Sequence, residues 1–126
     1  MKSLILGVIL SIPAMGQELT REQEIIAMTI LGEARGEGEA GMYAVGCLLK
    51  QRKQNSSGKL SYSQICLKKW QFSCWNSKKI SDLDHLLNVP QAKMAIYLVK
   101  NMHRIDRAKI GNANHYYADY IKAPYW

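Results

Sequence analysis

Residues 20–39 read TREQEIIAMTILGEARGEGE, an apolar helical stretch that runs directly into a turn rich in glycine and glutamate. Ile25, Ile26 and Ile30 recur at the spacing of one helical face. Glu33 follows Ile30 by three residues and therefore continues that apolar face. The pattern predicts a helix that carries a carboxyl group at the edge of the core, at the point where the chain turns away.

A carboxyl group in that position has two interpretations. Apolar neighbours disfavour its charged form, so Glu33 can stay protonated near neutral pH and donate a proton as a general acid. Alternatively, the run is a charged helix end in which Glu33 or Glu37 pairs with Arg35 at the surface. The pattern by itself leaves both interpretations open.

The rest of the chain is also predicted to be helical. Thr20 with Gln23, and Ser61 with Gln64, have the spacing of capping boxes that open helices. We expect helices over residues 20–32, 41–53, 61–69 and 90–105, with loops at 55–58 and 70–77. No strand-length run alternates Val and Ile, so any β-structure should be short and confined to the loop after the third helix or to the tail. The expected fold is mainly α, or α+β at most, with an irregular aromatic tail from residue 111.

The first 16 residues predict a signal peptide. Lys2 precedes an apolar run at 4–12, and small residues at 13–16 suit cleavage after Gly16. The run is shorter than the roughly 20 apolar residues of a membrane span, although an uncleaved anchor is an alternative. We therefore expect an exported protein, in the periplasm, cell wall or medium, with a single domain over residues 17–126 and no stable membrane span.

Three cysteines in an exported chain cannot all pair with one another. Cys47 lies in an apolar run, whereas Cys66 and Cys74 flank the aromatic stretch at 70–72. We expect a disulfide between Cys66 and Cys74 that fixes this loop. Three reduced thiols, or a pair that includes Cys47, are the alternatives. The sequence has no His-x-x-x-His or Cys-x-x-Cys pair, so we expect neither a metal nor another cofactor.

Four ordered blocks of the sequence resemble the cell wall hydrolase family of spore cortex-lytic enzymes. They are GEARGE at 32–37, GMYAV at 41–45, QFS at 71–73 and HYYADYIKAPYW at 115–126. The resemblance implies a small, lysozyme-like helical domain that cleaves peptidoglycan glycan strands, in many members as a lytic transglycosylase. It implies that Glu33 is the catalytic glutamate. Relatives typically carry Asn-Arg near the end of the second helix, where this chain has Gln51-Arg52, so only the arginine carries over.

The chemistry can be considered without the family. Glycosidic cleavage needs a proton for the leaving oxygen and stabilisation of an oxocarbenium-like centre. A hydrolase would use a second carboxylate, and none of the candidates, Glu37, Glu39 and Asp119, is compelling. In a transglycosylase the muramoyl 6-hydroxyl attacks the anomeric carbon, and one glutamate serves as acid and then base. The single well-placed acid favours a lytic transglycosylase, with a muramidase as the alternative.

A glycan strand presents flat sugar faces, acetamido groups and anionic peptide stems, so its binding cleft needs aromatic, amide and cationic side chains. The candidate substrate-binding residues are Arg35, Glu37, Arg52, Gln71, Phe72, His115, Tyr116 and Tyr120. For Phe72 and Trp70, packing in the core is the stronger alternative. We expect the tail at 115–126 to fold back across the cleft headed by Glu33, with a frayed terminus as the alternative.

The formal net charge of +7 suits attraction to anionic wall polymers, although it would equally suit nucleic acid. We expect peptidoglycan, and not nucleic acid, as the partner of a monomeric protein. Two other classes of function compete with glycan cleavage. A thiol amidase or peptidase would pair Cys47 with His85, His103 or His115, although the apolar surroundings of Cys47 favour an inert thiol. A noncatalytic peptidoglycan- or protein-binding module would be unaffected by Glu33→Gln.

Overall fold

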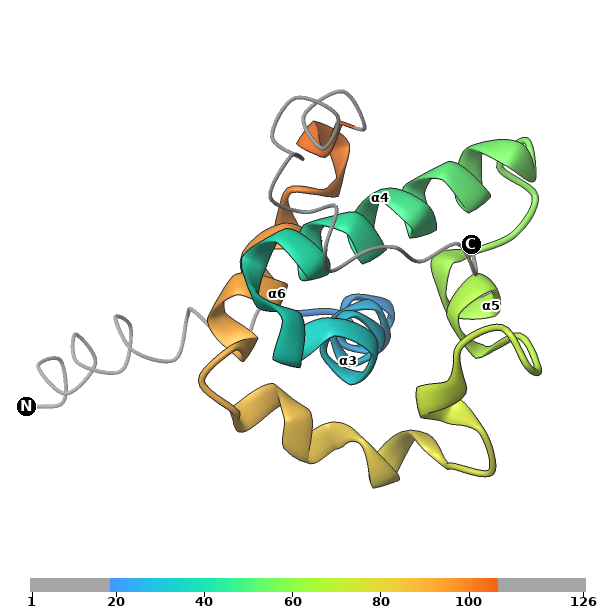
Figure 1. Cartoon of the computed structure of the whole chain (residues 1–126). Coiled ribbons are helices and arrows are strands. Elements are labelled where there is room, and N and C mark those ends of the chain that lie inside the picture. The colour runs from blue at the N-terminus through green and yellow to red at the C-terminus, as the bar shows by residue number, and fades with distance from the viewer. Residues whose placement is uncertain (1–18, 107–126) are drawn as a thin grey trace, which may run out of the picture.

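The structure, a computed structural model, describes residues 19–106. Helix α3 (Arg21–Ala34) runs through the centre of this segment, and α4 (Gly38–Asn55), α5 (Tyr62–Leu67) and α6 (Ala92–Lys100) surround it (Figure 1). Short 3₁₀ turns complete the enclosure: η1 (Arg35–Glu37), η2 (Ser73–Trp75), η3 (Ile80–Asp82), η4 (Asp84–Asn88) and η5 (Met102–Arg104). Residues 19–106 contain no strand, which confirms the mainly α class.

The central helix is more deeply enclosed than its sequence pattern predicts. Every residue from 25 to 31 is buried, whereas the pattern predicted one apolar face. Helix α3 packs against α4, α5, α6, η2 and η4, so neighbours cover it on all sides. A helix that is covered on all sides has no polar face until its ends. Glu33 lies at one of these ends, on the last turn of α3.

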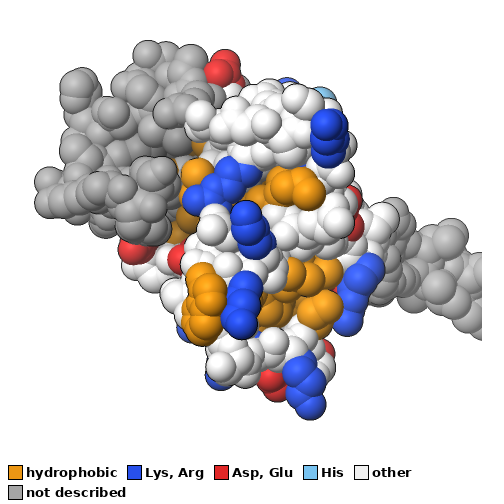
Figure 2. Space-filling view, turned by 90° about the vertical axis from the view of Figure 1, so that its right-hand side faces the viewer, with side chains coloured by type: hydrophobic (Ala, Val, Ile, Leu, Met, Phe, Trp, Pro, Cys, Tyr) orange, Lys and Arg blue, Asp and Glu red, His pale blue; other side chains and the backbone are white. Residues whose placement is uncertain are grey.

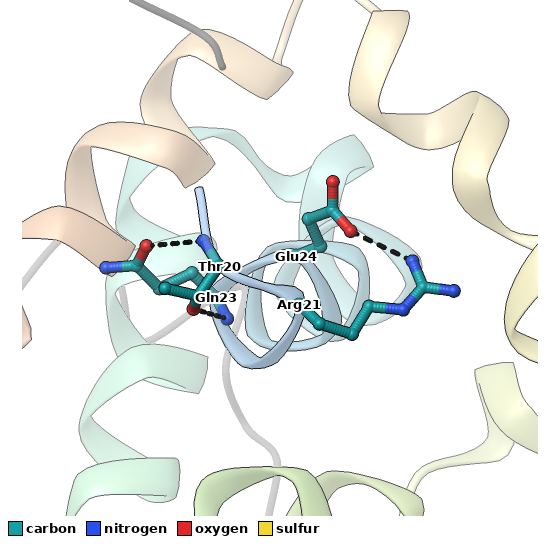
Figure 3. A network of polar contacts seen from close by, with 4 residues as sticks. All are labelled: Thr20, Arg21, Gln23 and Glu24. Carbon is teal, nitrogen blue, oxygen red and sulfur yellow. Dashed lines mark hydrogen bonds and ion pairs between the residues drawn. The ribbon is translucent and has the colours of Figure 1, made fainter. Parts of the chain in front are cut away.

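The predicted capping box at the start of α3 is confirmed (Figure 3). The hydroxyl of Thr20 accepts a hydrogen bond from the Gln23 amide at 3.0 Å, and the Gln23 side chain accepts one from the Thr20 amide at 2.9 Å. Arg21 and Glu24 form an ion pair of 2.9 Å on the adjacent surface. These bonds satisfy amides that a helix start leaves unpaired, and they fix where α3 begins.

The other boundaries differ from the predictions by a few residues. Ser61 and Gln64 form the second predicted capping box, but α5 ends at Leu67, two residues early. Helix α4 extends beyond its predicted range at both ends, and the turn after it contains Ser57 and Gly58 with positive φ, as expected of a loop. Helix α6 is shorter than predicted, and the 3₁₀ turns η3 and η4 precede it. Local sequence signals therefore predicted the presence of each helix more accurately than the residues at which it begins and ends.

A buried hydroxyl connects three elements of the core. Thr29 of α3 is fully buried, and its hydroxyl donates a hydrogen bond to the carbonyl of Ile25 at 2.7 Å. The same oxygen accepts a hydrogen bond from the indole nitrogen of Trp75 in η2 at 2.9 Å. The thiol of Cys66 in α5 also bonds to Thr29. This network holds the loop at residues 68–77 against the central helix.

The structure corrects the expected disulfide. Cys66 and Cys74 are both free thiols, as is Cys47. Cys66 bonds to Thr29, whereas Cys74 bonds to the side chain of Glu33, so each thiol has its own partner. Burial raises the pKa of the Cys66 thiol to about 12, so this thiol keeps its proton at neutral pH.

Two sequence predictions fall on the termini. The predicted signal peptide and the aromatic tail lie outside the described residues. Within residues 19–106, none of the helices has both the length and the apolar character that crossing a bilayer requires.

Candidate active site

The carboxylate of Glu33 is half-buried and is held by a residue from the loop at 68–77. The backbone amide of Cys74 donates a hydrogen bond of 3.0 Å to Glu33 Oε2. The Cys74 thiol also hydrogen-bonds to Glu33. Burial, and secondly the charge of Glu33, raise the pKa of this thiol well above its usual value, so it keeps its proton and can donate. One residue therefore fixes the orientation of the carboxylate.

Gly32 explains how the loop can come so close to α3. A Cβ atom at this position would lie 2.7 Å from Cβ of Cys74 and 2.8 Å from its Sγ, which is too close for any real side chain. Only a residue without a side chain lets the Cys74 amide reach Glu33 on the same turn. The glycine before the acid therefore has a packing role within the helix.

We expect Gly32→Ala to be less stable than Gly36→Ala by about 1–3 kcal/mol in free energy of unfolding, because the new methyl group overpacks against Cys74. Gly36 is the matched control, since a Cβ atom there meets nothing within 4 Å. Both changes add one methyl group and raise helical propensity, so the comparison isolates the contact with Cys74. Chemical denaturation measures both values. Equal stability of the two variants would contradict this role of Gly32.

Glu33 faces a surface hollow of about 440 Å³ at the junction of α3 and η1. Arg35 and Glu37 line the same hollow, so the structure brings three of the predicted site residues together. Arg35 is exposed and its guanidinium donates to the carbonyl of Leu31 at 3.1 Å. Among residues 19–106 it forms no ion pair with Glu33 or Glu37, so the charged helix end that was the alternative interpretation lacks its predicted pairing.

The side chain of Glu37 lies against the first turn of α4, the helix that follows it. It is the N-cap residue of α4, and a Cβ atom at Gly41 would lie 2.7 Å from Cβ of Glu37 and 3.1 Å from its Oε1. The carboxylate thus sits beside the first turn of α4, where the helix dipole favours negative charge. Gly41 provides the space for this conformation. Glu37 therefore borders the hollow while its carboxylate lies against the start of α4.

Arg52, Gln71 and Phe72 lie together at a second place. Arg52 and Gln71 line a separate hollow of about 250 Å³, and the guanidinium carbon of Arg52 lies 5.1 Å from the centroid of the Phe72 ring. Arg52 Nη1 is buried without a hydrogen-bond partner. Phe72 is only 5% exposed, so it supports Arg52 from the core and is not a surface for a sugar ring, which corrects its expected binding role.

A family model described as Cell Wall Hydrolase matches residues 36–126, which is more than half of the chain. The chain belongs to the cell wall hydrolase family. Membership makes it a hydrolase of the cell wall, whose polymer is peptidoglycan. The match begins at Gly36 and therefore includes neither Glu33 nor Arg35. No curated protein and no solved structure matches the chain.

Other predicted residues of this cell wall hydrolase either lie outside the described residues or line another hollow. His115, Tyr116 and Tyr120 lie outside the described residues. Cys47 is buried and lines a different hollow of about 460 Å³, which it shares with His103. The described segment holds no group of three His, Cys, Asp or Glu side chains that could bind a metal ion.

Sequence reasoning missed the partner of Glu33. Cys74 is 41 residues away along the chain, and its spacing suggested only a disulfide. A signal was present at Gly32, because a glycine inside an apolar helical stretch often marks a close approach of another segment. The sequence does not say which segment approaches.

Proposed function

We propose that this cell wall hydrolase cleaves the glycan strands of peptidoglycan, with Glu33 as a single general acid and base. The observation that carries the proposal is the position of the Glu33 carboxylate, which is half-buried, held by Cys74 and open to a hollow. A carboxyl group that is oriented by the protein and reached from solvent can give a proton to a glycosidic oxygen and later remove one.

We propose lytic transglycosylation as the reaction, with a muramidase as the alternative. Glu37 is the second carboxylate beside the hollow, but it lies back over Gly41 at the start of α4. Glu39 is exposed on the first turn of α4 and does not line the hollow, whereas Asp119 lies outside the described residues. Because neither Glu37 nor Glu39, the two described candidates, is placed as a second catalytic carboxylate, attack by the 6-hydroxyl of the muramoyl sugar is the simpler route.

We propose further that Arg35 and Arg52 contact acidic or acetamido groups of the strand, and that Gln71 and Glu37 supply polar contacts beside them. Arg52 Nη1 supports this role, because a buried donor without a partner is costly unless a ligand satisfies it. We expect contacts from His115, Tyr116 and Tyr120 in the tail, action as a monomer and export through the segment at residues 1–16. Peptidoglycan, not nucleic acid, is the proposed partner.

Digestion of purified peptidoglycan with residues 17–126 tests the reaction. Transglycosylation leaves anhydromuramoyl ends, which are lighter by one water than the reducing ends left by a muramidase. Mass spectrometry of the released muropeptides distinguishes the two. Release of free peptide stems with intact glycan strands would instead indicate an amidase or peptidase and overturn the proposal.

A further inference from the structure

The loop at residues 68–77 also lines a hollow distinct from the one at Glu33. Its volume is about 400 Å³, and it shares no lining residue with the hollow at Glu33. Trp70 and Trp75 line it together with Lys68, Lys69 and Asn76. Cys74 bonds to Glu33, and Trp75, the next residue, lines this hollow. The same loop therefore contributes to both places.

The two tryptophans have opposite environments. Trp75 is only 8% exposed, and its indole nitrogen donates a hydrogen bond to Thr29. Its ring therefore forms the floor of the hollow. Trp70 is 70% exposed, the largest value among the exposed large hydrophobic residues at 19–106. Its φ of 64° places it in the left-handed region, which is unfavourable for a bulky side chain. The loop thus holds an aromatic ring in solvent at a conformational cost, which is typical of a binding surface.

The surface around this hollow is positively charged. Residues 59–81 contain five lysines and neither Asp nor Glu. The lysines are all exposed: Lys59, Lys68, Lys69, Lys78 and Lys79. The face on the α5 side shows blue cationic and orange apolar side chains interleaved, with acidic side chains at its margins (Figure 2). The ammonium group of Lys69 lies 5.3 Å from the centroid of the Trp70 ring, so charge and ring form one unit.

We propose that this hollow is a docking site for an anionic glycan, separate from the catalytic hollow. The tryptophan rings would contact the apolar face of a sugar, and Lys68 and Lys69 would bind its carboxylate substituents. The choice of glycan rests on the proposed function, which makes an anionic wall glycan the substrate. An anionic membrane surface would also attract these lysines, and the binding test below distinguishes it from a glycan.

Binding to insoluble peptidoglycan tests the docking site. The measurement uses residues 17–126 carrying Glu33→Gln, so that digestion does not remove the ligand during sedimentation. We expect Trp70→Ala, and separately Lys68→Gln with Lys69→Gln, to weaken binding about ten-fold each, the effect of about 1.4 kcal/mol. Lys68→Arg with Lys69→Arg should restore binding, and added salt should weaken the binding of the parent protein.

The matched control lies on α6. Lys93 and the 57% exposed Tyr97 offer a lysine and an aromatic side chain away from the loop at 68–77, and Lys93→Gln with Tyr97→Ala should leave binding unchanged. Unchanged binding of the Trp70 and lysine variants would overturn the proposal. Trp70-dependent binding to anionic phospholipid vesicles, with peptidoglycan binding intact, would assign the surface to a membrane instead. The docking site is tested by binding, and the proposed reaction is tested by the mass of the muropeptide ends. Either proposal can therefore fail while the other holds.

Discussion

Replacing Glu33 with glutamine should reduce the rate of peptidoglycan cleavage by about 10²- to 10⁴-fold, the usual contribution of a general acid. Glutamine has the shape of glutamate, and its side-chain carbonyl can still accept the hydrogen bond from the Cys74 amide. The variant should therefore fold normally. What it loses is the proton that the leaving oxygen requires. The decrease in turbidity of a peptidoglycan suspension measures the rate.

Glu39→Gln is the control for this experiment. Glu39 is exposed on the first turn of α4, six residues further along the chain, and the hollow at Glu33 does not include it. Its neutralisation should change the helix dipole interaction by a few tenths of a kcal/mol and leave the rate within about two-fold. If Glu33→Gln and Glu39→Gln both clear peptidoglycan at the normal rate, Glu33 is not the acid. A normal rate for Glu33→Gln would also revive the noncatalytic binding module.

Trp75→Ala should lower the free energy of unfolding by about 3–5 kcal/mol, because it leaves a large cavity in the core. The indole anchors the loop at 68–77 in the core beside the central helix, and its nitrogen donates to the buried hydroxyl of Thr29. The loss should also affect catalysis, since Cys74 precedes Trp75 and orients Glu33. Urea denaturation followed by circular dichroism measures the stability.

Trp70→Ala removes the same side chain from the same loop and serves as the comparison. Trp70 is 70% exposed, so its removal should change stability by no more than about 0.5 kcal/mol. The pair separates the two roles of the loop, since Trp75 is expected to hold it in place and Trp70 to bind glycan. Similar stability losses for both variants would show that the loop is not anchored through Trp75.

Much of the fold was predictable from short-range patterns. The capping boxes at Thr20 and Ser61 join residues three apart, so the sequence contains both partners within one turn. The helical class followed from apolar spacing, and the place of Glu33 at the end of α3 followed from the same stripe. These features depend on local backbone geometry, and the structure confirms them.

The candidate site was predictable only in part. Glu33, Arg35 and Glu37 are neighbours in sequence and line one hollow. The role of Glu37 was not predictable, because its conformation depends on the space above Gly41. The sequence suggested that Phe72 and Trp70 share a tendency to pack in the core. The structure buries Phe72 and exposes Trp70, which a count of apolar residues cannot distinguish.

The sequence by itself determined the helical class, the two capped helix starts and the position of the acid on the last turn of α3. Only the tertiary structure decided that Cys74 holds Glu33 across 41 residues and that Trp75 reaches Thr29 across 46. It also decided that Cys66 and Cys74 have separate partners instead of each other. The physical reason is how far apart along the chain the contacting residues are. A cap or a helical stripe is complete within one or two turns, whereas a contact between distant segments depends on the path of all the chain between them.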